Sequence, residues 1–123
     1  MSKKVLNVGQ CGFDNHSIAA FLGRHFDVEI RNTNLAADTL AALGQESFDL
    51  VLINRKLDQD YSDGIDVLRS IRADESFGDV PVMLVSNYAD AQAAAVEAGA
   101  IQGFGKNEYD QPAIVDRLAQ VLC

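Results

Sequence analysis

Four places along this 123-residue chain carry polar or small residues that could do chemistry, each soon after a short apolar run. They are Gly9 with Gln10, then Asn54, Ser86 and Lys106. A hydroxyl group and an ammonium group can bind an anion, or they can hydrogen-bond the Asn54 carboxamide. None of these side chains is a carboxylate, the ligand that hard cations prefer, so we expect no metal here. We also expect no catalytic residue and no cofactor.

Other side chains allow further interpretations. Asp14, Asp58, Asp60 and Asp63 could form a displaced metal cluster, or they could be a solvated acidic loop with a helix cap at Asp14. Cys11 precedes the first expected helix, where a thiol can be redox-active, but it can equally be inert because no resolving cysteine lies nearby.

Apolar patterning predicts the elements that must position these residues. Short runs predict five strands, at residues 5–8, 26–30, 50–53, 81–85 and 101–104. Apolar residues three and four apart predict helices between and after them, around residues 18–22, 35–43, 65–71, 89–98 and 114–122. The last helix would take Asp110 as its N-cap and Pro112 in its first turn.

The central strands show no alternation of apolar and polar residues. Runs 50–53 and 82–85 are apolar throughout, which is typical of parallel strands covered on both faces. We therefore expect an α/β fold, a three-layer doubly wound five-stranded parallel sheet of the flavodoxin-like (β/α)5 type, in one domain spanning residues 1–123. Ligand sites in such folds lie beyond the carboxyl ends of the strands, where the four polar places fall.

Composition narrows the classes of partner. The net charge is -8 and the sequence pI is about 4.5, so phosphate groups of nucleic acids and anionic lipids would be repelled. We expect no binding to nucleic acid or membrane by this domain. The first apolar run is too short for a signal peptide or membrane span, which favours a cytoplasmic protein, and two cysteines without CxxC predict no disulfide or zinc scaffold.

Several segments, in order, resemble the receiver domains of bacterial two-component response regulators. Residues 48–53 are similar to the third strand of that family and residues 63–72 to its third helix. Residues 80–86 are similar to its fourth strand with the terminal Ser or Thr, and residues 98–100 lead to Lys106 at the family's spacing. The resemblance extends through essentially the whole chain.

The resemblance implies a site that this chain has altered. In the family, an acidic pair after the first strand and an Asp after the third hold Mg²⁺, and that Asp accepts a phosphoryl group. The acidic-pair positions are Gly9 and Gln10 here, and the acceptor position is Asn54. Ser86 and Lys106 are retained. The switch-aromatic position falls on Gly103, and the loop after Asn54 looks two residues longer than usual.

From this resemblance we expect an atypical receiver, or pseudo-receiver, that is not an enzyme, works without phosphorylation and binds proteins. Its partners would be signalling proteins or an output domain, and a homodimer is a further option. The face from the fourth to the fifth helix, with Gln92, Phe104 and Tyr109, would bind them. Two alternatives stay open: a phosphorelay receiver with residual response to phosphate or metal, and a small flavodoxin-like enzyme.

Overall fold

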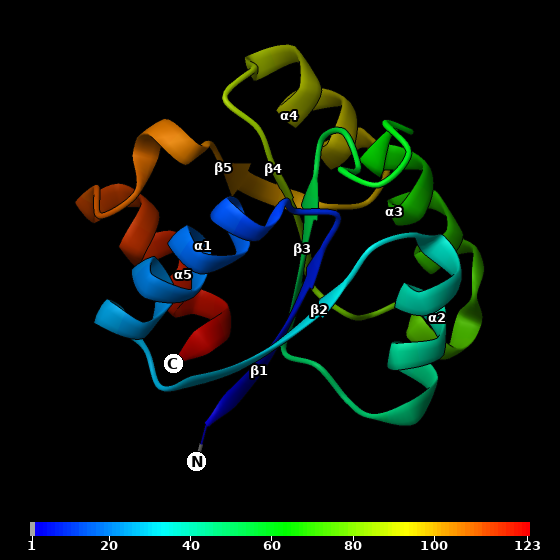
Figure 1. Ribbon diagram of the computed structural model, residues 1–123, viewed down its shortest axis with the longest axis horizontal. Helices are drawn as coiled ribbons and strands as arrows, with labels where there is room; N and C mark the ends of the chain where they lie inside the picture. The colour runs from blue at the N-terminus through cyan, green and yellow to red at the C-terminus, as the bar shows by residue number, and fades with distance from the viewer. Residues whose placement is uncertain (1) are drawn as a thin grey trace.

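The computed structural model describes residues 2–123, which form a five-stranded parallel sheet between two layers of helices (Figure 1). The strand order is β2-β1-β3-β4-β5, and every neighbouring pair is parallel. The strands are β1 (Lys3–Val8), β2 (Val28–Thr33), β3 (Leu50–Asn54), β4 (Val82–Val85) and β5 (Ile101–Phe104). The predicted α/β flavodoxin-like fold is confirmed.

The helices divide between the two faces of the sheet. They are α1 (Gly12–His25), α2 (Ala36–Gln45), α3 (Gly64–Ala73), α4 (Ala89–Glu97) and α5 (Pro112–Leu122), with short 3-10 turns at Glu75–Phe77 and Lys106–Glu108. One apolar core lies under α1 and α5, and the other under α2, α3 and α4. None of the helices in residues 2–123 is long and apolar enough to cross a membrane.

Strand β3 shows why unbroken apolar runs predict a sheet covered on both sides. Leu50 and Leu52 belong to the core under α1 and α5, whereas Val51 and Ile53 belong to the opposite core. All four side chains are fully buried. Each such side chain stabilises the fold by roughly 1.5–3 kcal/mol relative to an exposed position, so the apolar core holds the carboxyl end of β3, and with it Asn54, in place.

Three local expectations need correction. Strand β2 begins at Val28 because the N–H of Phe26 still bonds to Leu22 and closes α1. The N-cap of α5 is Gln111, because Asp110 adopts a positive φ of 65° and its carboxylate pairs with Arg24 and His25 instead.

The third correction concerns the start of α1. Its N-cap is Cys11, whose sulfur accepts a hydrogen bond from the backbone N–H of Asp14 at 3.4 Å. Asp14 is therefore not the cap and lies in the first turn. Its carboxylate is left free to contact another part of the molecule.

The β4–β5 ladder is irregular. Met83 pairs with Ile101 and Val85 with Phe104, so two steps along β4 face three along β5. Such an extra residue is a β-bulge, which interrupts the regular hydrogen bonds between strands. The bulge lies at Gly103 or beside it, where the sequence resembles the switch-aromatic position of receivers.

Candidate functional site

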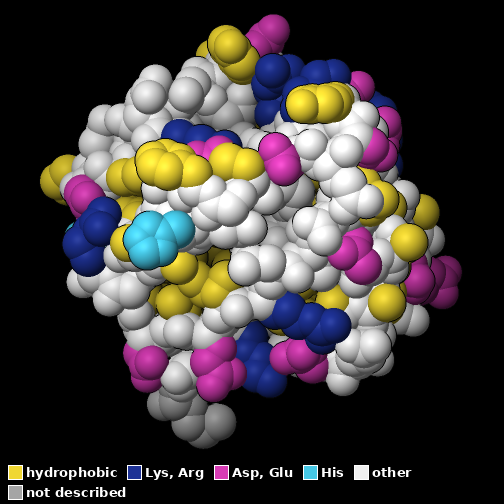
Figure 2. All heavy atoms as spheres, in the orientation of Figure 1, with side chains coloured by type: hydrophobic (Ala, Val, Ile, Leu, Met, Phe, Trp, Pro, Cys, Tyr) yellow, Lys and Arg dark blue, Asp and Glu magenta, His cyan; other side chains and the backbone are white. Residues whose placement is uncertain are grey.

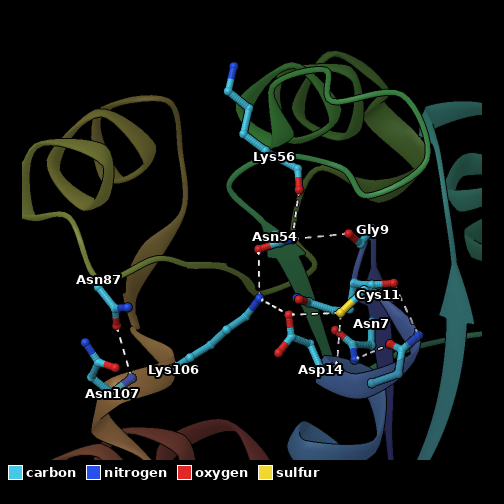
Figure 3. Close-up of polar contacts among 11 residues, drawn as sticks. Asn7, Gly9, Cys11, Asp14, Asn54, Lys56, Asn87, Lys106 and Asn107 are labelled. Atoms are coloured by element: carbon cyan, nitrogen blue, oxygen red, sulfur yellow. Dashed lines mark hydrogen bonds and ion pairs between the residues drawn. The ribbon is translucent and has the colours of Figure 1, made fainter.

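The predicted site residues follow strands at the carboxyl edge of the sheet, where Figure 3 shows Gly9, Asn54 and Lys106. Asn54 ends the central strand β3, Gly9 follows β1, Ser86 follows β4, and Lys106 lies just after β5. Strand order reverses direction between β1 and β3, and ligand sites of doubly wound sheets lie at such a switch point. The structure therefore brings these four positions together, as the sequence predicts.

The carboxamide of Asn54 is hydrogen-bonded on both sides. Its nitrogen donates to the backbone carbonyl of Lys56 at 2.8 Å and to that of Gly9 at 3.2 Å. Its oxygen accepts from the ammonium group of Lys106 at 3.4 Å. The Gly9 carbonyl also accepts the backbone N–H of Asp58 at 2.9 Å, so the amide nitrogen adds a second donor to it.

Lys106 has its strongest contact with a carboxylate that sequence reasoning did not assign to it. Its Nζ lies 2.6 Å from Oδ2 of Asp14, and both side chains are about three-quarters buried. Burial raises the pKa of the Asp14 carboxyl, but the hydrogen bonds from Lys106 and Cys11 outweigh this effect and hold the pKa below its ordinary value of 3.8. No local pattern in the sequence indicates this pairing, because the two residues lie 92 positions apart.

Both the backbone conformation and the packing at Gly9 disfavour a residue with a side chain. Its φ is +76°, and a Cβ built there would lie 2.4 Å from Cδ2 of Leu57. Leu57 belongs to the long loop after β3, is 1% exposed, and is held by backbone bonds to Ser62 and Tyr61. The loop thus places an apolar side chain against the first acidic-pair position.

Gln10, at the second acidic-pair position, is 4% exposed. Within residues 2–123, neither its Oε1 nor its Nε2 has a hydrogen-bond partner, and the same holds for Oδ1 of the buried Asn7. Gln10 therefore lies near the site by sequence but makes no side-chain bond to Asn54.

Ser86 and its neighbours line a hollow beside Asn54 of about 240 Å³. The Ser86 hydroxyl forms no hydrogen bond with Asn54, and its Oγ accepts the N–H of Tyr88 at 3.1 Å. Across the hollow, the guanidinium of Arg55 lies 4.9 Å from the centre of the Tyr88 ring. Sequence reasoning missed Arg55 and Tyr88, although each stands within two residues of a predicted site residue.

The divalent cation that the resemblance implies does not fit these side chains. Mg²⁺ prefers several hard oxygen ligands, usually carboxylates. The carboxylate beside the site, Asp14, already pairs with Lys106, and among residues 2–123 no group of three or more His, Cys, Asp or Glu residues is arranged to hold a metal. Two of the loop carboxylates have local partners: Asp60 accepts from Ser62, and Asp63 pairs with Lys56.

The expected interaction face needs revision, because Gln92 is 5% exposed and Phe104 is 1% exposed. The Gln92 amide donates to the carbonyls of Leu84 at 2.9 Å and Ser86 at 3.0 Å, and accepts from the N–H of Gly103 at 3.1 Å. A Cβ at Gly103 would lie 2.1 Å from the Leu84 carbonyl oxygen. The side chains of Gln92 and Phe104 therefore lie in the interior of the domain, and neither is exposed to a partner.

Tyr109 is half-buried and stacks on Phe21, with ring centres 4.9 Å apart. Within residues 2–123 its hydroxyl is buried with no hydrogen-bond partner. Burial, with a smaller contribution from the Asp14 charge, raises its pKa to about 12. Tyr109 thus belongs mainly to the aromatic packing between α1 and α5.

Comparison with known proteins supplies the family. The family model described as "Response regulator receiver domain" matches residues 14–119. No curated protein matches the chain. Among solved structures, the receiver domain of NtrX from Brucella abortus is 25% identical, with 95% of this chain and 92% of that chain covered and a TM-score of 0.73. This chain spans 26% of a longer NtrX chain that it also matches.

Two further structures show the same fold at lower identity. A putative response regulator from Chloroflexus aurantiacus has a TM-score of 0.84 at 18% identity, covering 99% of this chain and 98% of that chain. The receiver domain of a sensor histidine kinase from Pseudomonas aeruginosa has a TM-score of 0.75 at 18% identity with the same coverage. In that protein a magnesium ion is coordinated in the active site cleft.

Proposed function

This chain belongs to the response regulator receiver domain family of two-component signalling, and on that premise we propose that it is an atypical receiver that works without phosphorylation. Residues 1–123 act as one domain. The domain is not an enzyme and transmits its signal by binding other proteins, either signalling proteins or an output domain.

The hydrogen bonding of Asn54 carries this proposal. A carboxamide is a far weaker nucleophile than a carboxylate, so Asn54 is a poor phosphoryl acceptor. Its side-chain nitrogen donates hydrogen bonds to the backbone carbonyl oxygens of Gly9 and Lys56. The Asn54 carboxamide therefore has hydrogen-bond partners on both sides without a cation.

The pairing of Lys106 supports the same proposal. Phosphoryl transfer requires positive groups that can neutralise the incoming phosphoryl oxygens. Here the Lys106 ammonium is bound at 2.6 Å to Asp14, a carboxylate on α1 rather than at either acidic-pair position. The retained lysine thus ties α1 to the segment after β5, which is a structural role.

Exposed aromatic side chains support protein binding. Phe13 is 78% exposed, Tyr61 is 75% exposed and Tyr88 is 59% exposed, and each lies in a loop or first helical turn at the carboxyl edge of the sheet. Aromatic residues are enriched at the centres of protein interfaces. We place the partner-binding surface at this edge.

Intact-mass measurement tests the loss of phosphorylation. The protein is incubated with acetyl phosphate and Mg²⁺ beside the NtrX receiver domain from Brucella abortus, a family member that serves as the comparison. We expect no added phosphoryl group on this chain. A stoichiometric, base-labile addition of one phosphoryl mass would overturn the proposal and point to another carboxylate, with Asp58 the first to examine.

Signalling output in the native cell tests the partner surface. Phe13→Ser and Tyr61→Ser should impair output, because each removes an exposed aromatic contact. Val96→Ser is the matched control, since Val96 is 43% exposed on α4, away from this edge. Equal output from all three variants, with folding intact, would contradict the placement of the surface.

A further inference from the structure

We infer that a cleft at the amino edge of the sheet binds an arginine side chain of a partner protein. This amino-edge cleft has a volume of about 390 Å³ and lies between the end of α2 and the segment that joins α3 to β4. The chain runs from its two walls into the amino ends of β3 and β4, so the cleft lies at the edge opposite Asn54. The inference goes beyond the proposed function, because it adds a second surface to the one proposed at the carboxyl edge.

The apolar part of the cleft suits the body of an arginine side chain. Phe48 and Phe77 line the cleft and are partly buried against the core under α2, α3 and α4, together with Leu43 and Val80. Aliphatic and aromatic surface can pack against the methylene groups of arginine. A guanidinium group also stacks on the face of an aromatic ring, which attracts it electrostatically.

Two carboxylates that line the cleft are available to a cation. Glu75 and Asp79 are exposed, and within residues 2–123 neither side chain forms an ion pair or a hydrogen bond. No lysine or arginine is among the residues that line the cleft. Arg72 interacts with the charge of Asp79, but its guanidinium donates to the carbonyls of Gly78 at 3.1 Å and Gly99 at 3.0 Å. Both carboxylates can therefore accept hydrogen bonds from a ligand.

The opposite wall of the cleft adds a smaller negative contribution. Glu46 is already paired, with Lys4 at 3.2 Å and Arg31 at 2.9 Å. Helix α2 ends in this wall with no basic residue in its last turn, and the carboxyl end of a helix carries partial negative charge. Figure 2 shows mainly acidic and hydrophobic side chains along the right-hand margin of the molecule, at the level where α2 lies in Figure 1. The cleft therefore favours a cation.

The wall that carries the free carboxylates is held by its own hydrogen bonds. The Asp74 side chain accepts the N–H of Ser76 at 2.9 Å, and the Asp74 carbonyl accepts that of Phe77 at 3.0 Å. The N–H of Val80 bonds to the Phe77 carbonyl at 3.2 Å. Because the segment is ordered before a ligand arrives, binding costs less conformational entropy.

Charge indicates that the arginine comes from a different protein. Two copies of a chain with a net charge of -8 repel each other. The arginines of this chain also have internal contacts already, in ion pairs, with backbone carbonyls or over a ring: Arg24, Arg31, Arg55, Arg69, Arg72 and Arg117. A segment of a partner protein with an exposed arginine meets neither obstacle.

A ¹H–¹⁵N NMR titration of the full chain with the acetylated and amidated tripeptide glycyl-arginyl-glycine tests the cleft. We expect saturable shifts at the amides of Glu75 and Phe77. The double variant Glu75→Gln with Asp79→Asn should weaken binding by about tenfold or more, the range expected when charged hydrogen-bond acceptors are lost. Glu97→Gln with Asp116→Asn is the matched control, since it removes the same charge from exposed positions of α4 and α5. It should bind as the wild type does.

Further peptides test which part of arginine is recognised. The lysine tripeptide should bind more weakly, and the tripeptide with citrulline, a neutral isostere of arginine, should give no saturable shifts. Phe77→Leu keeps an apolar side chain without the ring and should narrow the preference for arginine over lysine. Unchanged affinity in the double variant, equal binding of the citrulline peptide, or an unchanged preference in Phe77→Leu would overturn the inference.

Sedimentation equilibrium of the chain alone tests the source of the arginine. We expect a monomer at the concentrations of the titration. A dimer that the variant Glu75→Gln with Asp79→Asn no longer forms would assign the cleft to a second copy of this chain, and the assignment to a partner protein would then be wrong.

Discussion

The side chain of Gln92 accepts a hydrogen bond from the backbone N–H of Gly103 at 3.1 Å, across the bulge in β5. The same carboxamide donates to the Leu84 carbonyl of β4 at 2.9 Å. One side chain of α4 thus replaces strand-to-strand bonds that the bulge interrupts. Gly103 is the residue where the sequence resemblance predicts the switch-aromatic position, and here the side-chain amide of Gln92 joins α4 to the sheet beside it.

Replacing Gln92 should destabilise the fold. Gln92→Ala would leave the Gly103 N–H and the Leu84 carbonyl buried without this partner, at a cost of about 1–3 kcal/mol. Urea unfolding at neutral pH would measure the change. Gln120→Ala on the exposed side of α5 is the control and should change stability little. Equal stability of the two variants would show that the amide bridge contributes nothing.

Asn54→Asp should lower stability and leave phosphorylation absent. A carboxylate has no N–H, so its oxygens would face the carbonyl oxygens of Gly9 and Lys56 that now accept hydrogen bonds. We expect a loss of about 1–3 kcal/mol in the free energy of unfolding, measured in EDTA. Asn54→Ala removes the same bonds without adding charge and should be the more stable of the two.

Magnesium should not rescue the Asn54→Asp variant. Gly9 and Gln10 supply no carboxylate, and one hard ligand binds Mg²⁺ poorly. Unfolding in Mg²⁺ and mass measurement after acetyl phosphate treatment would test this. Strong Mg²⁺-dependent labelling would mean that Asp14 or Asp58 already provides the missing ligands.

The Asp14–Lys106 pair should make stability depend on acidic pH. The pKa of Asp14 in the folded protein lies below its ordinary value of 3.8. The unfolded chain therefore binds a proton first as pH falls, and the stabilisation present above pH 3.8 is lost as pH falls through the folded pKa. Asp14→Asn should flatten the acid side of a stability-against-pH curve. Lys106→Gln should flatten the same range, and an unchanged curve would rule the pair out as its source.

Tyr109→Phe should be tolerated at neutral pH. The substitution removes a buried hydroxyl that has no partner in residues 2–123 and keeps the ring that stacks on Phe21. We expect an equal or higher free energy of unfolding, measured in urea. Tyr61→Phe, at an exposed position, is the control for the chemical change itself.

The same variant should also resist alkali better. The pKa of Tyr109 is raised from 10.0 to about 12, so the unfolded chain loses this proton first as pH rises. Stability is therefore lost between those two values in the wild type, and Tyr109→Phe should lose less. A steeper alkaline loss in the variant would contradict the burial of the hydroxyl.

The sheet and the edge where its site lies could be predicted from the sequence, because both depend on apolar runs. Strand β5 has the bounds 101–104 that its short run predicts, and β3 and β4 differ by one residue at an end. Strand β2 was placed too early, since Phe26 is apolar enough to join a run and yet closes α1. Strand ends with polar residues, such as Thr33, carry no apolar signal.

Side-chain contacts between distant segments could not be predicted in the same way. Asp14 and Lys106 lie 92 residues apart, and their pairing depends on how α1 begins after β1. The burial of Gln92 depends on the bulge in β5, and no residue type in the sequence indicates that a bulge is present. The ion pairs of Asp110 with Arg24 and His25 likewise outweigh the preference of aspartate for the N-cap position of a helix. Each case is decided by tertiary geometry rather than by periodicity.

The contact between Gly9 and Leu57 bears on how such a domain could change over generations. A carboxylate at residue 9 needs both a strained backbone, at φ +76°, and the space that Leu57 fills. Shortening Leu57 first would open a cavity in the core, at about 2–5 kcal/mol. Either order of substitution passes through a less fit intermediate. A lineage that carries both residues therefore meets a mutational barrier to acquiring a carboxylate at residue 9, and Gly9 and Leu57 are expected to be inherited together.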